Sequence, residues 1–296
     1  MQKFQHGGLW LVTGTAITWG TIGVATQAIY NGDATTSLFI NLARMLIATP
    51  VLLAACWFIV GPKMFRVQRR DFGILLLSGT FLAISHAAYF AAIQATGVTI
   101  ATLLTICLAP LVVTFVSVLL KFETLNGRIV LALISAMIGS VLLVGLHSPE
   151  GTDYNSPLGT TLSLISAVGY ASMIVCGRFL ATDYHPLQVT AITFGVGTIV
   201  LIAVNLVNGV VAVHTMQGWM LVLYLGLIPT AFAYWMFQTG LRSVSATAAS
   251  IIGMLDPLVA ALLAWVLFGE TLAATGIVGA GMLMISILLL SLDKSA

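Results

Sequence analysis

Long apolar stretches follow one another along the chain, and only short polar segments separate them. A helix needs roughly 20 mostly apolar residues to cross a bilayer, and ten stretches meet that condition. The runs lack the in/out alternation of a transmembrane barrel, so the pattern predicts an all-α membrane protein with ten transmembrane helices. We expect these helices at residues 8–30, 35–60, 72–94, 98–120, 127–146, 158–177, 187–207, 218–240, 244–267 and 272–292.

The composition supports a lipid-facing surface. Hydrophobic residues make up 59% of the 296 positions and charged residues only 7%, against roughly 45–50% and about 25% in a soluble domain. So few charges cannot cover a surface in water. The three cysteines are widely spaced within apolar runs, so we expect no disulfide framework, no metal site and no cofactor. The net charge of +2 gives no reason to expect a nucleic-acid partner.

The basic residues predict the orientation, because Lys and Arg concentrate in cytoplasmic segments. With a cytoplasmic N-terminus, ten of the eleven basic residues fall inside, and Arg44 lies within a helix. The opposite orientation places the same ten outside. We therefore expect a multi-pass protein with both termini in the cytoplasm. The ten residues are Lys3, Lys63, Arg66, Arg69, Arg70, Lys121, Arg128, Arg178, Arg242 and Lys294.

An internal repeat divides the chain. The sequence Pro-Leu-Val at Pro110 recurs at Pro257, 147 residues later, and Glu-Thr-Leu at Glu123 recurs at Glu270 in the same register. We expect one five-helix repeat in residues 1–150 and a second in residues 151–296. Because five is odd, the second repeat enters the membrane inverted. Inverted repeats are typical of transporters that work by alternating access, with a site near the midplane.

The Glu-Thr pair of each repeat is predicted to be structural. Thr124 and Thr271 are expected to cap the helices that follow them, with Glu123 and Glu270 near the positive ends of those helices.

These motifs resemble the EamA family, the ten-helix branch of the drug/metabolite transporter superfamily, over essentially the whole chain. The resemblance implies export of amino acids, related metabolites or toxic compounds from a bacterial cytoplasm, through a central cavity in an inner-membrane protein. Within the family, the chain looks most like exporters of aromatic amino acids and methyl viologen. The residues that carry the resemblance are Ala109-Pro110 with Phe122-Glu123-Thr124-Leu125, Asp256-Pro257 with Gly269-Glu270-Thr271-Leu272, Trp19-Gly20 and Arg44. The two signatures differ where Ala109 stands opposite Asp256.

Three ionisable residues within the predicted spans are candidates for substrate contact, because polar groups in hydrocarbon are costly. Arg44 would bind a substrate carboxylate, and Asp256 a substrate ammonium or a proton. His86 can change charge near neutral pH and would couple export to protons. For each residue, a bond that only holds neighbouring helices together is the alternative.

Five aromatic residues are expected deep in the membrane: Trp19, Tyr89, Tyr170, Tyr234 and Trp235. A buried phenol or indole N–H needs a hydrogen-bond partner, and these rings would line a cavity suited to flat or apolar solutes. Ordinary packing between helices accounts equally well for some of them.

The sequence thus predicts a non-enzymatic membrane transporter with a small-molecule substrate, surrounded by the lipid bilayer. A multidrug transporter of the same fold is the first alternative, followed by a channel or an intramembrane enzyme. The chain carries neither a His-Glu-x-x-His nor a Gly-x-Ser-x-Gly motif, which argues against the enzyme. Proton coupling, and the choice between monomer and homodimer, stay open.

Overall fold

The computed structural model describes residues 2–96, 98–144, 157–209, 212–213, 215–268 and 273–292. These residues form helices without a strand, and ten helical segments are long and apolar enough to cross a membrane. The predicted all-α membrane fold is therefore confirmed. The first five crossings are α1 (Gln2–Gly32), α2 (Ser37–Val60), α3 (Arg69–Thr96), α4 (Val98–Leu119) and α5 (Gly127–Val144), with a short 3₁₀ turn η1 (Gly61–Phe65) after α2.

Two of the last five crossings are irregular. The regular ones are α6 (Pro157–Leu180), α7 (Pro186–Asn208) and α12 (Ala274–Ser291). The eighth crossing is built from α8 (Met216–Gly226), a π-helical turn η2 (Leu227–Phe232) and α9 (Ala233–Gly240). The ninth consists of α10 (Ala246–Gly253) and α11 (Asp256–Phe268).

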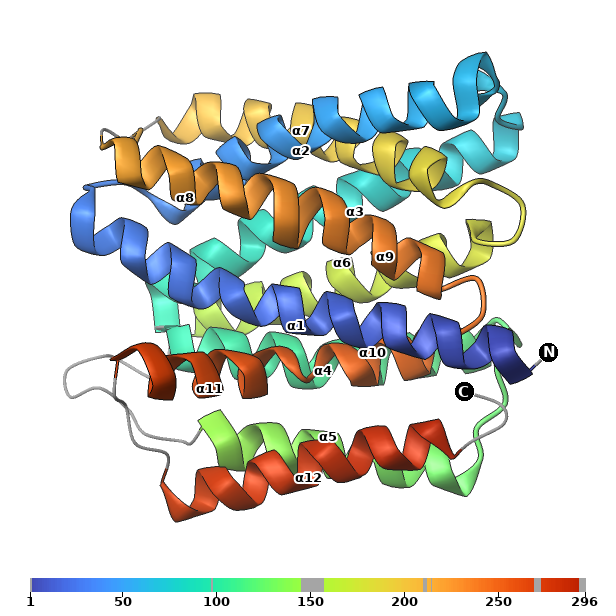
Figure 1. Ribbon diagram of the computed structural model, residues 1–296, viewed down its shortest axis with the longest axis vertical. Coiled ribbons are helices and arrows are strands. Elements are labelled where there is room, and N and C mark those ends of the chain that lie inside the picture. The colour runs from blue at the N-terminus through green and yellow to red at the C-terminus, as the bar shows by residue number, and fades with distance from the viewer. Residues whose placement is uncertain are drawn as a thin grey trace.

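The crossings lie side by side in one bundle, with α5 and α12 paired at one edge (Figure 1). The main core joins both halves of the chain: α3 packs on α6 and α7, α4 on α6, α2 on α7, and α1 on α9 and α11. Large apolar side chains such as Phe58 and Phe115 are exposed on the outside. This distribution suits a bundle whose outer solvent is lipid.

One end of the bundle collects the loops that carry basic residues. At this end, Arg128 at the start of α5 donates to the Leu292 carbonyl after α12, with Nη1 and O 2.9 Å apart. Arg178 at the end of α6 likewise donates to the Leu241 carbonyl after α9, at 2.6 Å. Both arginines thus satisfy carbonyls that a helix end leaves free.

The predicted cap at the start of α5 is wrong. Asn126, rather than Thr124, accepts from the Ile129 amide, at 2.9 Å. Glu123 reaches across to the other half of the chain and accepts from the amides of Ala246 and Thr247, at 2.5 and 3.2 Å. A carboxylate suits the positive N-terminus of α10, so this glutamate caps a distant helix. The predictions for Glu270 and Thr271 lie outside the described residues.

Candidate functional site

The regular hydrogen bonding of two crossings is interrupted in the same part of the bundle. Pro229 has no N–H to donate to the Leu225 carbonyl one turn earlier, and the Thr230 hydroxyl donates to this carbonyl instead, at 2.7 Å. In the ninth crossing, α10 ends at Gly253 and α11 begins at Asp256. Such interruptions in a membrane helix need compensating partners and commonly mark functional positions.

Aromatic rings from four crossings meet beside these interruptions. The ring centroid of Trp19 lies 5.0 Å from that of Tyr234 and 6.2 Å from that of Tyr170. Phe237 and Phe194 complete the group, with centroids 5.3 Å from Trp19 and 4.8 Å from Tyr234, respectively. We call these five residues the aromatic cluster. Centroid separations of this size are favourable for tilted and edge-to-face contacts.

A hydrogen bond fixes the indole of the aromatic cluster. Trp19 Nε1 donates to the carbonyl oxygen of Pro229, at 3.1 Å, which links α1 to the π-helical turn. Thr15, one turn earlier in α1, donates to the Ala233 carbonyl at 3.0 Å. The expected partner of the buried indole N–H is therefore the backbone of an irregular helix.

The predicted ionisable residues come from three crossings, with Arg44 in α2, His86 in α3 and Asp256 at the start of α11. Arg44 is 7% exposed, and among the described residues no direct ion pair joins it to Asp256. The Nε atom of Arg44 and the Nδ1 atom of His86 are buried without a hydrogen-bond partner. Buried polar atoms without partners are costly. They therefore indicate a place where a ligand or water completes the bonding.

Asp256 lies beside the aromatic cluster. A Cβ on Gly20, the residue after Trp19, would lie 2.9 Å from the carbonyl oxygen of Asp256, and a Cβ on Gly253 would lie 3.9 Å from the hydroxyl of Tyr170. The hydroxyl of Tyr89 shares a hydrogen bond of 2.6 Å with that of Thr102, which ties α3 to α4. Ring and backbone contacts thus bring together Trp19, Tyr170, Tyr234 and Asp256, whereas Arg44, His86 and Tyr89 stay predicted site residues.

Trp235 is the exception. Its ring lies 5.6 Å from that of Phe232, a residue that is 46% exposed, and the partly buried Trp235 packs against the main core. Among the described residues, its ring contacts include no member of the aromatic cluster.

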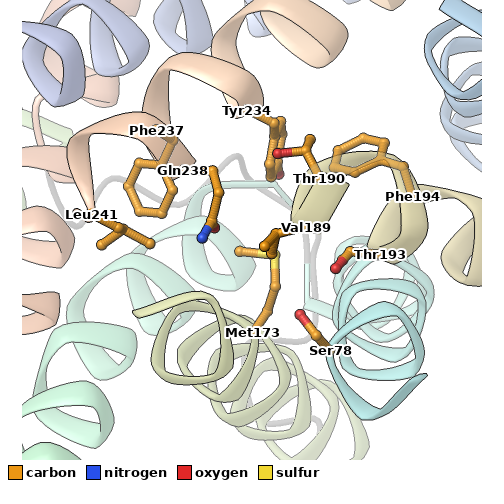
Figure 2. A pocket seen from close by; sticks show the side chains of 10 residues that line it. All are labelled: Ser78, Met173, Val189, Thr190, Thr193, Phe194, Tyr234, Phe237, Gln238 and Leu241. Carbon is orange, nitrogen blue, oxygen red and sulfur yellow. The ribbon is translucent and has the colours of Figure 1, made fainter. Parts of the chain in front are cut away.

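A small cavity borders the aromatic cluster between α3, α6, α7 and α9. Figure 2 shows the polar groups of Ser78, Thr193 and Gln238 around it. Its volume of about 20 Å³ is enough for roughly one water molecule. The Thr193 hydroxyl is buried without a partner, whereas Gln238 donates to the Gly177 carbonyl at 2.7 Å. The full lining is Ser78, Met173, Val189, Thr190, Thr193, Phe194, Tyr234, Phe237, Gln238 and Leu241.

Sequence reasoning missed Phe194, Phe237, Thr193 and Gln238. Phenylalanine is common throughout the apolar runs of this chain, and a membrane threonine usually bonds to its own helix. Nothing in the sequence distinguished these residues from ordinary packing. Gln238 offered the one usable signal, because an amide within a span needs a partner.

The family model described as the EamA-like transporter family matches residues 6–145 and 157–292. The chain belongs to this family. It is 29% identical to an uncharacterized transporter from Archaeoglobus fulgidus, with 93% of each chain covered. It is 27% identical to the uncharacterized transporter YwfM of Bacillus subtilis, covering 93% of this chain and 90% of that one.

A third relative has the membrane location in its name. The uncharacterized inner membrane transporter YicL of Salmonella typhimurium is 26% identical, with 94% of this chain and 93% of that one covered. A protein crystal structure superposes with a TM-score of 0.81 at 18% identity, covering 96% of both chains, which shows that the fold is shared. This EamA-family chain is therefore a multi-pass membrane transporter.

Proposed function

We propose that this EamA-family transporter exports amino acids with aromatic or other apolar side chains, or closely related metabolites. One observation carries the proposal. The guanidinium of Arg44 is buried with its Nε unbonded, and the carboxyl residue Asp256 lies beside the aromatic cluster without a direct ion pair to Arg44 among the described residues. An amino acid has the complementary groups: a carboxylate, an ammonium and a side chain.

The chemistry assigns each group a partner. The planar guanidinium of Arg44 matches a carboxylate and stays protonated. Asp256 supplies the negative charge for the substrate ammonium. Trp19, Tyr170 and Tyr234 offer ring faces and edges to an apolar or aromatic side chain. The buried Nδ1 of His86 lacks a partner among the described residues, which supports a role for His86 in contacting the substrate or carrying a proton. Tyr89 and Trp235 stay candidate contacts.

We further propose that the chain consists of two inverted five-helix repeats, 1–150 and 151–296, which open the site alternately to each side of the membrane. The contacts between helices support this arrangement. In the first half, α3 and α4 both pack on α6, the first helix of the second half. In the second half, α9 and α11 occupy the matching crossings, and both pack on α1, the first helix of the first half. The hydroxyl of Ser135 in α5 donates to the carbonyl of Met282 in α12, 147 residues further along, at 2.8 Å. This separation equals the register of the sequence repeat.

Two glycine contacts repeat in the same way. A Cβ on Gly79 of α3 would meet Thr193 and Val196 of α7. A Cβ on Gly226 of α8 would meet the backbone of Arg44 and the side chain of Ile47 in α2. Gly79 and Gly226 are 147 residues apart. Their partners correspond in the same way, because Arg44 and Thr193 are 149 residues apart, and so are Ile47 and Val196.

We also propose that the end with the basic loops faces the cytoplasm of a bacterial cell, so that export runs toward the opposite end.

The test is flux of radiolabelled phenylalanine and tyrosine in liposomes that contain only this protein, with and without a pH gradient. We expect saturable movement that unlabelled aromatic amino acids compete for, and at least a tenfold loss in Arg44→Gln and Asp256→Asn. Gln27→Ala is the control, because Gln27 is exposed and bonds only within α1, to Asn31. Wild-type protein that is folded and moves no amino acid would overturn the substrate assignment. Flux in the variants that equals wild-type flux would overturn the site.

A further inference from the structure

Side chains from the two halves of the chain are bonded together at the end opposite the basic loops, which the proposed orientation places outside. Asp33 follows α1, and Thr215 precedes α8. The Asp33 carboxylate accepts from the backbone N–H of Thr215 at 2.9 Å and from its hydroxyl at 2.5 Å. Asp33 is 8% exposed. We call this pair the outer latch.

A second set of bonds joins the halves at the opposite end, beside the basic loops. The hydroxyl of Tyr184, in the loop between α6 and α7, donates to the Asp71 carboxylate at 2.6 Å. The same hydroxyl accepts from the backbone N–H of Gln68 at 3.2 Å. Close by, Gln188 of α7 donates to the Met64 carbonyl at 2.9 Å. We call the contact of Tyr184 with Asp71 and Gln68 the inner latch.

The two latches occupy matching places in the proposed repeats. Gln68 and Thr215 are 147 residues apart, the register that also relates Pro110 to Pro257. Each donates its backbone N–H from the segment just before α3 or α8. Each acceptor, Tyr184 or Asp33, stands in the loop just before α7 or α2. The backbone arrangement is the same at both ends, but the accepting group is a phenol at one end and a carboxylate at the other.

Both latches are closed in this structure, and the cavity beside the aromatic cluster has room for roughly one water molecule. An amino acid is larger than this cavity. Opening one end means moving the loops of the two halves apart there, which breaks the bonds of that latch and leaves the other intact. A groove of about 530 Å³ beside the inner latch, lined by Arg66, Gln68 and Tyr184 among others, gives water access to its bonds.

We propose that the outer and inner latches hold the transporter in an occluded state, and that each half of the transport cycle breaks one of them. This inference rests on the proposed function, because it assumes that the two ends open in turn. It assigns Asp33, Thr215, Tyr184 and Asp71 to control of access, separate from substrate contact.

The test measures opening directly, by electron spin resonance distances between pairs of spin labels, without substrate. The inner pair is attached to Arg69→Cys and Thr182→Cys, and the outer pair to Asn31→Cys and Gln217→Cys, all at exposed positions. The native cysteines Cys56, Cys107 and Cys176 are replaced in the background protein.

Tyr184→Phe keeps the ring and removes the bonds of the inner latch. We expect roughly a tenfold larger population of long inner-pair distances, with the outer pair unchanged, because a bond to a charged group is lost at one end only. Asp33→Asn should increase the population of long outer-pair distances and leave the inner pair unchanged. Thr215→Ala is a second outer variant that leaves Asp33 in place. Asp183→Asn is the control, because Asp183 is exposed in the loop of Tyr184, and among the described residues its side chain has no hydrogen bond to Asp71, Gln68 or Tyr184; its bond to Thr182 is already absent in the labelled background.

Distances that stay as in wild type in Tyr184→Phe and in both outer variants would overturn the latches, and so would a variant that opens the opposite end. The outcome is separable from the proposed function, because flux is measured independently. Shifted distances in a protein that moves no amino acid would leave the latches standing and remove the substrate assignment. Amino-acid flux without any shift of the distances in the variants would leave the substrate assignment standing and remove the latches.

Discussion

The contact between α3 and α7 depends on the absence of a side chain at Gly79. A Cβ built on this residue would lie 2.5 Å from the carbonyl oxygen of Thr193 and 2.6 Å from the Cβ of Val196. Ordinary contacts of a Cβ begin at 3.4 Å. Because a backbone carbonyl cannot rotate away as the end of a side chain can, Gly79→Ala must push the helices apart by about 0.9 Å, the difference between 3.4 and 2.5 Å.

Two opposing effects set the size of the change in stability. Alanine is favoured over glycine in a helix by about 1 kcal/mol, whereas overfilling a packed contact costs roughly 1–3 kcal/mol. The separation also forfeits part of the dispersion energy along the α3–α7 contact. We expect Gly79→Ala to lower the free energy of unfolding by about 1–2 kcal/mol, which is roughly a 5- to 30-fold change in the ratio of folded to unfolded protein.

The assay is thermal unfolding of the purified protein in detergent, with Gly73→Ala and Gly195→Ala as controls. Gly73 lies in α3 and Gly195 in α7, and a Cβ on either would meet nothing within 4 Å. Both controls should unfold at or above the wild-type temperature, and Gly79→Ala should unfold several degrees below it. A Gly79→Ala protein as stable as Gly73→Ala would refute the argument that this contact requires a glycine.

Three further outcomes are expected. Trp19→Phe keeps a ring but loses the bond to the π-helical turn, so stability in the same melting assay should fall by about 1 kcal/mol. Partial burial and the nearby Arg242 lower the pKa of His185 from 6.5, and its neutral Nδ1 caps α7. The stabilisation by this cap is therefore present above pH 6.5 and lost as the pH falls through the lowered pKa. His185→Ala should lower the free energy of unfolding by roughly 0.5–1 kcal/mol at pH 7.5 but not at pH 4. Partial burial raises the pKa of Tyr184 above 10.0, so spin-label distances at the inner latch should not change between pH 6 and 9.

The transmembrane helices were predictable because lipid imposes a strict condition on length and polarity. The backbone must satisfy its hydrogen bonds within each crossing, so every span appears as a long apolar run. The expected stretch at 218–240, for example, corresponds to the crossing Met216–Gly240. The interruptions within crossings were only partly predictable. Pro110 and Pro257 occupy matching positions of the sequence repeat, but Pro110 lies inside the continuous α4, while Pro257 follows a break between α10 and α11.

Partners across the bundle could not be predicted, because an apolar run does not indicate which neighbour each face contacts. Glu123 and Asn126 illustrate the point. The local pattern favoured capping of the next helix by Thr124, but Glu123 bonds to α10, more than 120 residues away, and Asn126 caps α5. Likewise, the sequence predicted five deep aromatic residues without distinguishing which of them share a site, and the ring contacts join only Trp19, Tyr170 and Tyr234 of these five.

The proposed repeats are equivalent in backbone but not in chemistry, and this difference bears on how a substrate would bind. Thr49 of α2 and Thr198 of α7 are 149 residues apart and share a hydrogen bond of 2.7 Å. Arg44 and Thr193 are also 149 residues apart, so they occupy equivalent positions in the two proposed repeats. Asp256 and Ala109 are equivalent by the 147-residue spacing of the sequence repeat. The first half thus supplies the buried guanidinium of Arg44, and the second half the carboxyl group of Asp256.

A site with exact twofold chemistry would accept a substrate in two orientations. Under the proposed function, a zwitterion would have one orientation, with its carboxylate toward α2 and its ammonium toward α11. Exchanging the charges tests this: Arg44→Asp combined with Asp256→Arg should restore part of the flux that either single change removes, because a zwitterion can bind in the reversed orientation between equivalent backbones. If the double variant is no more active than the single ones while remaining folded, the charges do not act as a pair on the substrate. Arg44 and Asp256 would then be bracing the helices around the site.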